Sequence, residues 1–447
     1  MTYEHEALTM KKVYRRLVPF LFLLLVINYL DRVNIGFAAL RMNHELGLSS
    51  TAFGIGAGVF FLGYALFEVP SNAVLYRLGA RLWIGIILIT WGFASGIMAF
   101  VHNEYSFYVL RFIVGAAEAG FMPGVIVYLA NWFPSRYRSR ANAGVVVATA
   151  LASAIGSPIS GFLMKWTDGV LGLSGWRWMF ICEALPAVLL GFVVFYWLTD
   201  SPERAKWLTP NERDWLSAEL EIERCRLAAT SKFTLLQVLK LRKVWALSAL
   251  FSCFLSALYG VLLWAPQIVK SFGRLTDIEV GLLGSLPFCC AAIAMPLIAR
   301  RSDRLNERRL HVAASMGVGG VALLASAYAP NPYISFTLLC VAAAGIWGSL
   351  GVFWSMTSTF LAGPAAALGI AVINTLAQIG GFIGPSSVGF IKDRTGNFSL
   401  ALAVLASFAL IAAIIAYRLG DERGEKKSML TLLLNDGSGA KAELHER

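Results

Sequence analysis

The sequence predicts an all-α polytopic membrane protein in which twelve transmembrane helices form two six-helix bundles. Three observations support this fold class. Hydrophobic residues make up 57% of the 447 residues and charged residues only 15%, with a mean hydropathy of +0.65, a balance that excludes an ordinary soluble domain. Apolar runs of about 20 residues, the length that crosses a bilayer, recur along the whole chain. One long polar stretch divides these runs into two equal sets, as expected of a duplicated unit.

The apolar runs give the expected elements in order. The first bundle, residues 17–198, is expected to hold spans at 17–39, 52–73, 82–101, 106–129, 142–164 and 177–198. The second bundle, residues 243–418, is expected to hold spans at 243–266, 277–299, 310–328, 333–359, 366–390 and 398–418. Residues 1–16 and 419–447 are expected to be tails, and residues 199–242 a linker.

The linker carries the signature of a helix start. In Thr209-Pro210-Asn211-Glu212 the Thr hydroxyl can cap an amide three residues on, Pro suits the first helical position, and Glu can reach back. The sequence therefore predicts a surface helix that runs to about Arg226.

The distribution of positive charge predicts the orientation in the membrane. Most of the 38 Lys and Arg residues fall in the two tails, the linker and the connections on the same side of the membrane. The positive-inside rule then puts both termini in the cytoplasm of a plasma (bacterial inner) membrane. The net charge of +11 is thereby explained by topology, so no nucleic-acid partner is expected. The six cysteines lack the paired spacing of metal or redox sites, and no metal or other cofactor is expected.

Charged residues in two apolar spans stand out: Asp31 and Arg32 in the first, and Arg111 and Glu118 in the fourth. A charge in the hydrocarbon core is costly, so such residues face a cavity, pair with one another and mark an ion or substrate path. At 1.5 Å per residue, Asp31, Arg32 and Arg111 are expected at one level, with Glu118 about 10 Å deeper. Arg111 and Glu118 are two helical turns apart and point from the same face.

These four residues suit the proton-coupled movement of an organic anion. An arginine stays charged and offers a planar fork that fits a carboxylate. A neighbouring carboxylate competes for that fork, and one that is removed from water can hold a proton instead. Protonation of the acid would free the arginine for substrate and so couple the two bindings. The alternative interpretation is a static salt bridge that only fixes the packing of the bundle.

Further polar side chains occur at depths compatible with the same cavity. Taken singly, each is expected to form an ordinary interhelical hydrogen bond; together they form a candidate set of substrate-binding residues. Asn374 and Gln378, one helical turn apart, stand out because the spans of the second half carry charged residues only near their ends. No phosphate-binding loop, nucleophile or metal arrangement is present, so the chain is not expected to be an enzyme. The candidate set is Tyr64, Tyr259, Trp354, Ser355, Asn374 and Gln378.

Two cytoplasmic turns repeat each other, one at 76–81 after the second span and one at 303–308 after the eighth. Charged residues at these points suit a latch that holds the bundles in one state. The two turns resemble the signature of the major facilitator superfamily and its weaker second copy. The first copy departs from it, with Asn72 for a glycine and Tyr76 for an aspartate. The expected latch residues are Arg77, Arg81, Asp303 and Arg304.

Longer strings narrow this resemblance. Residues 28–36 (NYLDRVNIG), 118–124 (EAGFMPG), 132–134 (WFP), 200–203 (DSPE) and 373–374 (IN) are similar to the anion:cation symporter family, in its branch of tartrate, phthalate and hydroxyphenylacetate permeases. The resemblance implies that Asp31 and Glu118 handle protons, and that Arg32 and Arg111 serve substrate and coupling. It also implies that Tyr64, Trp354 and Asn374 line the site. Leu151 stands where some members have a glutamine, so the substrate of those members does not transfer.

The function expected from the sequence is the proton-coupled import of a small organic carboxylate by alternating access. The substrate would be an aromatic acid of the phthalate or hydroxyphenylacetate type, or a tartrate-like acid. A monomer in the lipid bilayer is expected. Two alternatives stay open: a proton-driven exporter of organic anions or drugs, and a transporter-like sensor that binds a carboxylate and signals.

Overall fold

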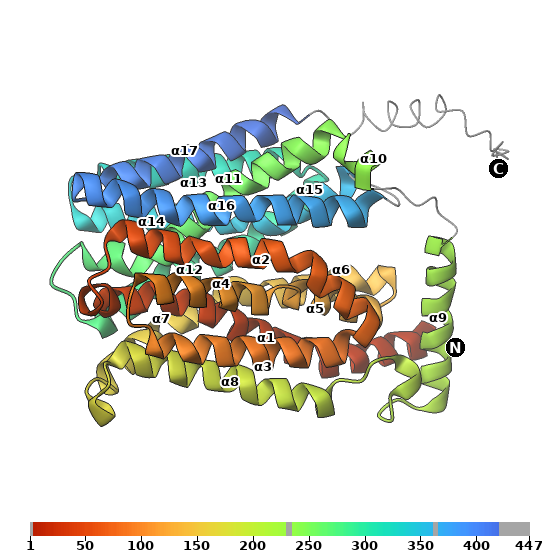
Figure 1. Ribbon diagram of the computed structural model, residues 1–447. Coiled ribbons are helices and arrows are strands. Elements are labelled where there is room, and N and C mark those ends of the chain that lie inside the picture. The colour runs from red at the N-terminus through yellow and green to blue at the C-terminus, as the bar shows by residue number, and fades with distance from the viewer. Residues whose placement is uncertain (1–2, 229–234, 361–364, 420–447) are drawn as a thin grey trace.

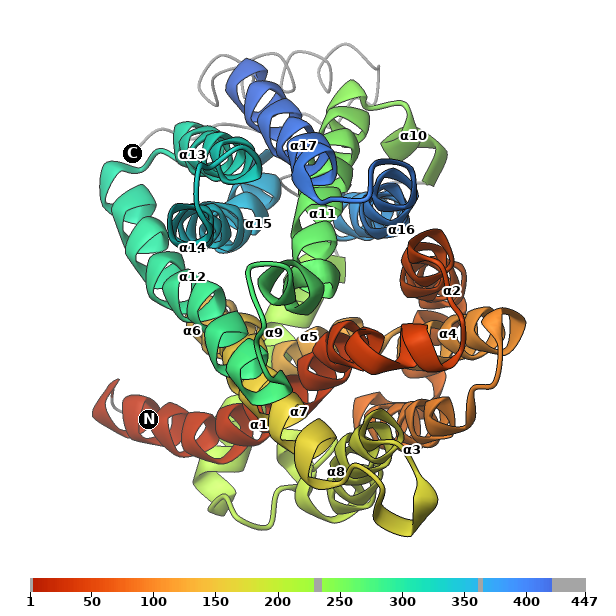
Figure 2. The same ribbon diagram turned by 90° about the vertical axis from the view of Figure 1, so that its left-hand side faces the viewer.

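The computed structural model describes residues 3–228, 235–360 and 365–419. All regular elements of the described chain are helices, gathered in two bundles that Figure 1 shows from the side and Figure 2 along the helix axes. The amino-terminal bundle contains α1 to α8 and the carboxy-terminal bundle contains α11 to α17. The structure confirms the predicted fold class. The predicted tail lies outside the described residues from position 420 on.

Helices of the amino-terminal bundle follow the predicted spans closely, although two of these spans are divided. The fourth span is made of α4 and α5, and the fifth of α6 and α7. The bounds are α1 Tyr3–Glu45, α2 Ser50–Leu78, α3 Ala80–Ile97, α4 Glu104–Glu118, α5 Phe121–Ala130, α6 Ser135–Val146, α7 Ala148–Trp166 and α8 Gly175–Trp197.

The carboxy-terminal bundle has one divided span, the tenth, made of α14 and α15. Within the described residues, eleven segments are long and apolar enough to cross a membrane; α6 and α7 occupy the position predicted for the remaining span. The bounds are α11 Arg242–Lys270, α12 Asp277–Leu305, α13 Arg309–Ala327, α14 Pro332–Gly348, α15 Leu350–Phe360, α16 Ala365–Thr395 and α17 Ser399–Arg418.

The break in the fourth span brings a carboxylate to a helix end inside the membrane. Gly120 adopts φ +91°, a left-handed conformation that glycine tolerates without strain. The Ser71 hydroxyl donates a hydrogen bond to the carbonyl of Ala119 at 2.6 Å, which satisfies a polar group released by the break. As a result α4 ends at Glu118.

The linker helix α9, Pro210–Ala228, is attached to the amino-terminal bundle. Its predicted capping box is present, because the Thr209 amide donates to the Glu212 carboxylate at 2.7 Å. Glu212 also pairs with Lys12 of α1 at 2.9 Å, and Trp207 stacks on Trp132 with ring centroids 5.3 Å apart. The first helix begins at Tyr3 and spans 43 residues, or about 65 Å, so it projects well beyond a bilayer toward α9.

The bundles touch most extensively along two pairs of helices, α2 with α16 and α7 with α12, and α1 also packs against α11. Small residues allow the close approach. A Cβ atom on Gly54 would lie 2.6 Å from the Pro385 carbonyl oxygen, and one on Gly161 would lie 2.6 Å from that of Asp277. Such contacts between backbones are the usual way in which helices pack tightly in lipid.

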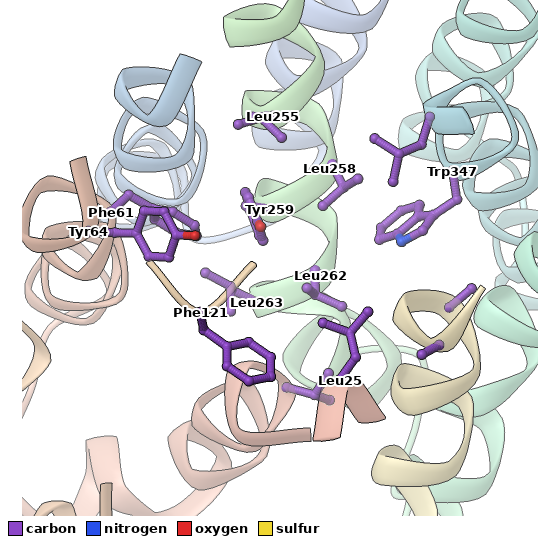
Figure 3. Close-up of a cluster of buried hydrophobic side chains, with 14 of the residues drawn as sticks. Leu25, Phe61, Tyr64, Phe121, Leu255, Leu258, Tyr259, Leu262, Leu263 and Trp347 are labelled. Carbon is purple, nitrogen blue, oxygen red and sulfur yellow. The ribbon is translucent and has the colours of Figure 1, made fainter. Parts of the chain in front are cut away.

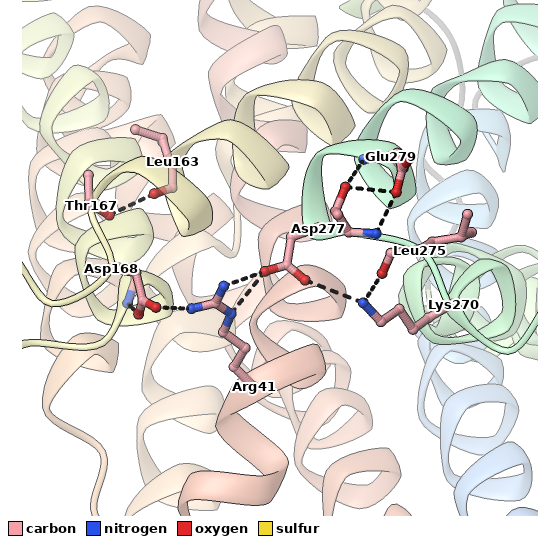
Figure 4. Close-up of polar contacts among 10 residues, drawn as sticks. Arg41, Leu163, Thr167, Asp168, Lys270, Leu275, Asp277 and Glu279 are labelled. Carbon is pink, nitrogen blue, oxygen red and sulfur yellow. Dashed lines mark hydrogen bonds and ion pairs between the residues drawn. The ribbon is translucent and has the colours of Figure 1, made fainter. Parts of the chain in front are cut away.

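Polar contacts between the bundles also gather where α1 finishes and α2 begins, which we call the Arg41 end. Arg41 pairs with Asp168 of its own bundle at 2.5 Å and with Asp277 of the other bundle at 2.7 Å, as Figure 4 shows. Lys270 lies 3.8 Å from the same Asp277 carboxylate. We call these four residues the Arg41 cluster.

A second polar contact joins the bundles at the Arg41 end. The Asp393 carboxylate of α16 accepts hydrogen bonds from the first two amides of α2, those of Ser50 at 2.9 Å and Thr51 at 2.7 Å. A carboxylate at a helix amino terminus is favoured by the helix dipole. The opposite end of the bundles, where α2 finishes at Leu78, is called the Leu78 end below.

Candidate functional site

Arg32 forms the centre of the buried polar site. Its Nε donates to the Glu118 carboxylate at 2.7 Å, and Nη2 donates to the same oxygen. Nη1 donates to the Tyr259 hydroxyl at 2.7 Å. Glu118 comes from α4 and Tyr259 from α11, so one guanidinium links two helices of its own bundle to the other bundle. Glu118 accepts hydrogen bonds from two of the three donating nitrogens of Arg32. A second anion would therefore have to compete with Glu118 for this guanidinium.

Arg111 is buried yet has an incomplete set of partners. Its residue is 3% exposed, and its Nε is buried with no hydrogen-bond partner among the described residues. It lies in electrostatic range of Asp31 and Glu118. Its guanidinium carbon is 4.8 Å from the centroid of the Phe60 ring, while that of Arg32 is 5.3 Å from the same ring. One aromatic ring thus contacts both guanidinium groups, a favourable arrangement for cations.

Asp31 is turned toward α3. Its carboxylate accepts hydrogen bonds from Trp91 Nε1 at 2.6 Å, from Asn34 Nδ2 at 2.9 Å and from the Ser95 hydroxyl. Asp31 and Arg111, which were expected at one level, form no hydrogen bond or ion pair with each other in the described part of the chain. Asp31 is therefore a buried carboxylate held by neutral donors.

Aromatic side chains surround Arg32. Its guanidinium carbon lies 5.1 Å from the ring centroid of Tyr29 and 5.4 Å from that of Tyr64. Phe61 of α2 packs on Tyr259 of α11 with centroids 4.2 Å apart. Figure 3 shows Tyr64 and Tyr259 reaching toward each other from the two bundles. The surroundings of the guanidinium groups are thus largely aromatic.

The other predicted residues of the second half are distributed differently. Trp354 packs on Phe251, with centroids 4.9 Å apart, and Ser355 donates to the Gly351 carbonyl at 3.1 Å. Asn374 donates to Glu68 at 2.6 Å, and Gln378 is buried nearby on the same helix. Of the candidate set, Tyr259 is the member that contacts an arginine of the site by a hydrogen bond.

The expected latch residues do not meet each other. Arg81 pairs with Asp200, 3.2 Å from Nε to Oδ2, while Arg77, Asp303 and Arg304 are exposed. No ion pair joins the 76–81 turn to the 303–308 turn in the part of the chain that the structure describes. The bundles are thus tied by charge at the Arg41 end and not between these two turns.

Two buried acids were missed by the sequence reasoning. Glu68 in α2 is 3% exposed and Glu183 in α8 is 4% exposed. Glu183 accepts a hydrogen bond from Ser160 at 2.8 Å. Both lie in predicted spans, at 52–73 and 177–198, so the criterion that selected Asp31 and Glu118 would have found them.

The site can bind an anion and a proton at linked positions. A carboxylate brought to Arg111 would complete the partners of that buried cation. A proton on Glu118 would weaken its hold on Arg32, because hydrogen bonds between charged groups are about twice as strong as neutral ones. Among the described residues there is no group of three or more His, Cys, Asp or Glu that could hold a metal ion.

Comparisons with known proteins agree with this architecture. The sequence model of the Major Facilitator Superfamily matches residues 21–385 and 267–431. A protein of Agrobacterium vitis that carries the provisional name tartrate transporter is 47% identical over 435 residues, covering 97% of this chain and 96% of the relative. The quinolone resistance transporter of Acinetobacter baumannii is 39% identical over 402 residues, covering 90% of this chain and 92% of the relative.

Among solved structures, the chain is similar to a bacterial homolog of the human lysosomal transporter Spinster in an inward-facing and occupied conformation. The TM-score is 0.72 at 16% sequence identity, and the match covers 90% of this chain and 95% of that one. At this identity the likeness concerns the fold.

Proposed function

The chain belongs to the Major Facilitator Superfamily, and on that premise we propose that it is a proton-coupled symporter that imports a small organic carboxylate by alternating access. As a member of this superfamily it is a multi-pass membrane transporter and not an enzyme. The bacterial relatives and the charge distribution support a place in the inner membrane, with both termini in the cytoplasm. The Leu78 end then faces the cytoplasm and the Arg41 end faces outward.

The observation that carries the proposal is the unequal state of the two buried arginines. The buried Nε of Arg111 has no hydrogen-bond partner among the described residues, whereas Arg32 donates to Glu118. A substrate carboxylate is the ligand whose two oxygens match a guanidinium fork. Arg111 receives the carboxylate in this scheme, and Arg32 becomes available to it when Glu118 takes up a proton.

Proton and substrate are coupled because they act on the same guanidinium. With Glu118 charged, its attraction for Arg32 excludes a second anion. With Glu118 neutral, Arg32 carries an uncompensated charge that only an arriving anion can balance. Arg32 also donates a hydrogen bond to Tyr259 of the other bundle. Replacement of Glu118 by substrate at Arg32 would therefore alter a contact between the bundles. Asp31 is the second proton-handling acid in this proposal, and hydrogen bonds from Trp91 and Asn34 fix the position of its carboxylate.

Aromatic rings around the arginines support an aromatic acid as one class of substrate. The ring centroids of Tyr29, Phe60 and Tyr64 lie 5.1, 5.3 and 5.4 Å from the guanidinium carbon of Arg32, and a planar ring can stack between such faces. A tartrate-like acid is the second class, supported by the provisional name of the Agrobacterium vitis relative.

The test is uptake of labelled tartrate, phthalate and 4-hydroxyphenylacetate into proteoliposomes, each with and without an inward proton gradient. Gradient-stimulated uptake of one acid supports symport and identifies the substrate. No response from any acid contradicts the proposal.

A second candidate is a proton-driven exporter, and the name of the Acinetobacter baumannii relative favours it. In that case vesicles preloaded with an organic anion or a quinolone would lose it faster when protons flow the opposite way. Binding without movement in either direction would instead favour a sensor.

The Arg41 cluster is expected to hold the outer end closed. Replacing Arg41 by Gln removes the ion pair to Asp277 between the bundles, so the outer ends should separate more often. The measurement is the distance distribution between spin labels at Leu171 and Tyr333, both exposed at the Arg41 end. Labels are attached through cysteines in a background that lacks the six native ones.

Arg177→Gln is the matched control, since Arg177 pairs with Glu45 at 3.0 Å within one bundle at the same end. We expect a broader and longer distribution for Arg41→Gln and an unchanged one for Arg177→Gln. Equal distributions for Arg41→Gln and wild type would show that the cluster does not hold the end closed.

The ion pair of Arg41 with Asp168 is not expected to respond to pH in the neutral range. Hydrogen bonds from the Gly175 amide and from Arg41 hold the pKa of Asp168 below its usual value of 3.8. Because the pKa is lowered, the carboxylate stays charged at neutral pH, and the pair is lost only as pH falls through the lowered pKa.

A further inference from the structure

Glu68 is a buried acid that has no role in the proposed symport mechanism. It lies on α2, one helical turn from Tyr64 toward the Leu78 end, and is 3% exposed. Its carboxylate accepts hydrogen bonds from Asn374 Nδ2 at 2.6 Å and Thr375 Oγ1 at 3.0 Å. Both donors belong to α16, in the other bundle. No Lys, Arg or His of the described residues forms an ion pair with it.

Of the other ionisable groups near this part of α2, Tyr64 interacts electrostatically with Glu68. Arg111 and Glu118 of α4 and Arg32 of α1 interact with one another instead.

Among the described residues, the remaining elements packed against α2 supply no counter-charge. On α16, charged residues 392–394 lie nearly five turns away from Thr375, and Asp393 accepts hydrogen bonds from the amides of Ser50 and Thr51. On α3, Arg81 pairs with Asp200, and on α5 the Tyr128 hydroxyl donates to the Thr199 carbonyl. Within the described part of the chain, the hydrogen-bond partners of Glu68 are thus the two neutral donors Asn374 and Thr375.

This dependence ties the charge of Glu68 to the contact between the bundles. A buried carboxylate is tolerated only while it is hydrogen-bonded. Separation of α2 from α16 admits water to the carboxylate, which solvates the charged form. Contact between the two helices buries the acid beside two neutral donors, and burial disfavours the charged form of a carboxyl group. Proton binding and contact between α2 and α16 therefore favour each other, and by linkage the effect is reciprocal.

We infer that Glu68 is a further proton-binding site, occupied when α2 and α16 touch on the inner side of the substrate site and empty when they part and water reaches the carboxylate. The inference rests on the alternating access of the proposed function, but not on the identity of the substrate. It gives the transporter a proton site on the bundle interface itself, distinct from the acids beside the arginines.

The test follows the separation of the bundles with pH and without substrate. Spin labels are placed at Leu78 and Leu305, both exposed at the Leu78 end, in the cysteine-free background and in proteoliposomes. In the wild type, the separated population should grow as pH rises through a midpoint. In Glu68→Gln, which cannot gain a charge, at least half of this pH response should disappear.

Thr375→Val is a second variant, in which a side chain of similar shape removes one hydrogen-bond donor while Glu68 itself is kept. Without one donor the charged form of Glu68 is less favoured, so the midpoint should rise by about one pH unit. Glu183→Gln is the control, because Glu183 is a buried acid bonded to Ser160 within its own bundle, and its midpoint should stay unchanged.

A wild-type response retained in Glu68→Gln, an unmoved midpoint in Thr375→Val, or a wild type that ignores pH would each overturn the inference. Failure of the proposed function is recognised separately, in the uptake panel, because the distance measurement contains no substrate. Uptake without the pH-dependent separation would leave symport standing and reject Glu68 as a proton site.

Discussion

Replacing Arg111 by lysine is expected to reduce gradient-driven uptake at limiting substrate by roughly ten- to hundredfold. Lysine keeps the positive charge but loses the planar fork that binds both oxygens of a carboxylate. One hydrogen bond between charged groups contributes about 1.5–3 kcal/mol, which corresponds to that range of affinity. The measurement is initial uptake of the transported acid over a range of concentrations, with the loss expected in the apparent affinity.

Arg177→Lys is the matched control for this prediction. Arg177 makes a charged pair with Glu45 near the surface, and the same substitution there should leave uptake unchanged. Wild-type affinity in Arg111→Lys would mean that the buried guanidinium serves packing against Phe60 rather than substrate binding.

Glu118→Gln is expected to separate substrate movement from proton movement. Gln preserves the shape and one acceptor for Arg32 but cannot carry a negative charge or a proton. Uptake should lose its response to an inward proton gradient, while exchange of internal for external substrate, which needs no net proton movement, should survive. The measurement compares gradient-driven uptake with exchange in the same vesicles.

Glu104→Gln tests whether this effect is specific, since Glu104 is an exposed acid on the same helix, α4. Both activities should be kept in that variant. A Glu118→Gln protein that still accumulates substrate in proportion to the proton gradient would exclude Glu118 as the coupling acid.

Most of the fold could be predicted because apolar run length and the one polar linker are properties of sequence alone. The breaks within spans could not be predicted in the same way. Residues 106–129 read as one continuous apolar run, yet the helix stops at Glu118 because Gly120 takes a left-handed conformation and Ser71 binds the released carbonyl. Because the donor of that hydrogen bond lies on a different helix, the local sequence around Gly120 does not predict it.

The members of the central site were predictable, but their partnerships were not. Depth along a helix placed Arg32 beside Asp31 and Arg111, with Glu118 deeper. The structure pairs Arg32 with Glu118 instead, because successive residues of a helix point about 100° apart and an arginine reaches well beyond its own level. Asp31 thus faces Trp91 of α3, while Arg32 faces α4 and α11. Rotation about the helix axis, which depends on packing, decided the pairs.

The contacts that close the Arg41 end are more exposed than those at the centre, so this closure is expected to respond to salt. Across the bundles, Arg41 and Lys270 have side chains that are 32% and 41% exposed and lie against Asp277, which is 10% exposed, whereas those of Arg32 and Glu118 are 11% and 1% exposed. Dissolved ions screen exposed charges over about 8 Å at physiological strength and about 3 Å at 1 M, and reach buried pairs far less. In the proposed orientation, a saltier medium outside the cell is therefore expected to loosen the closure at the Arg41 end and to leave the central pair intact.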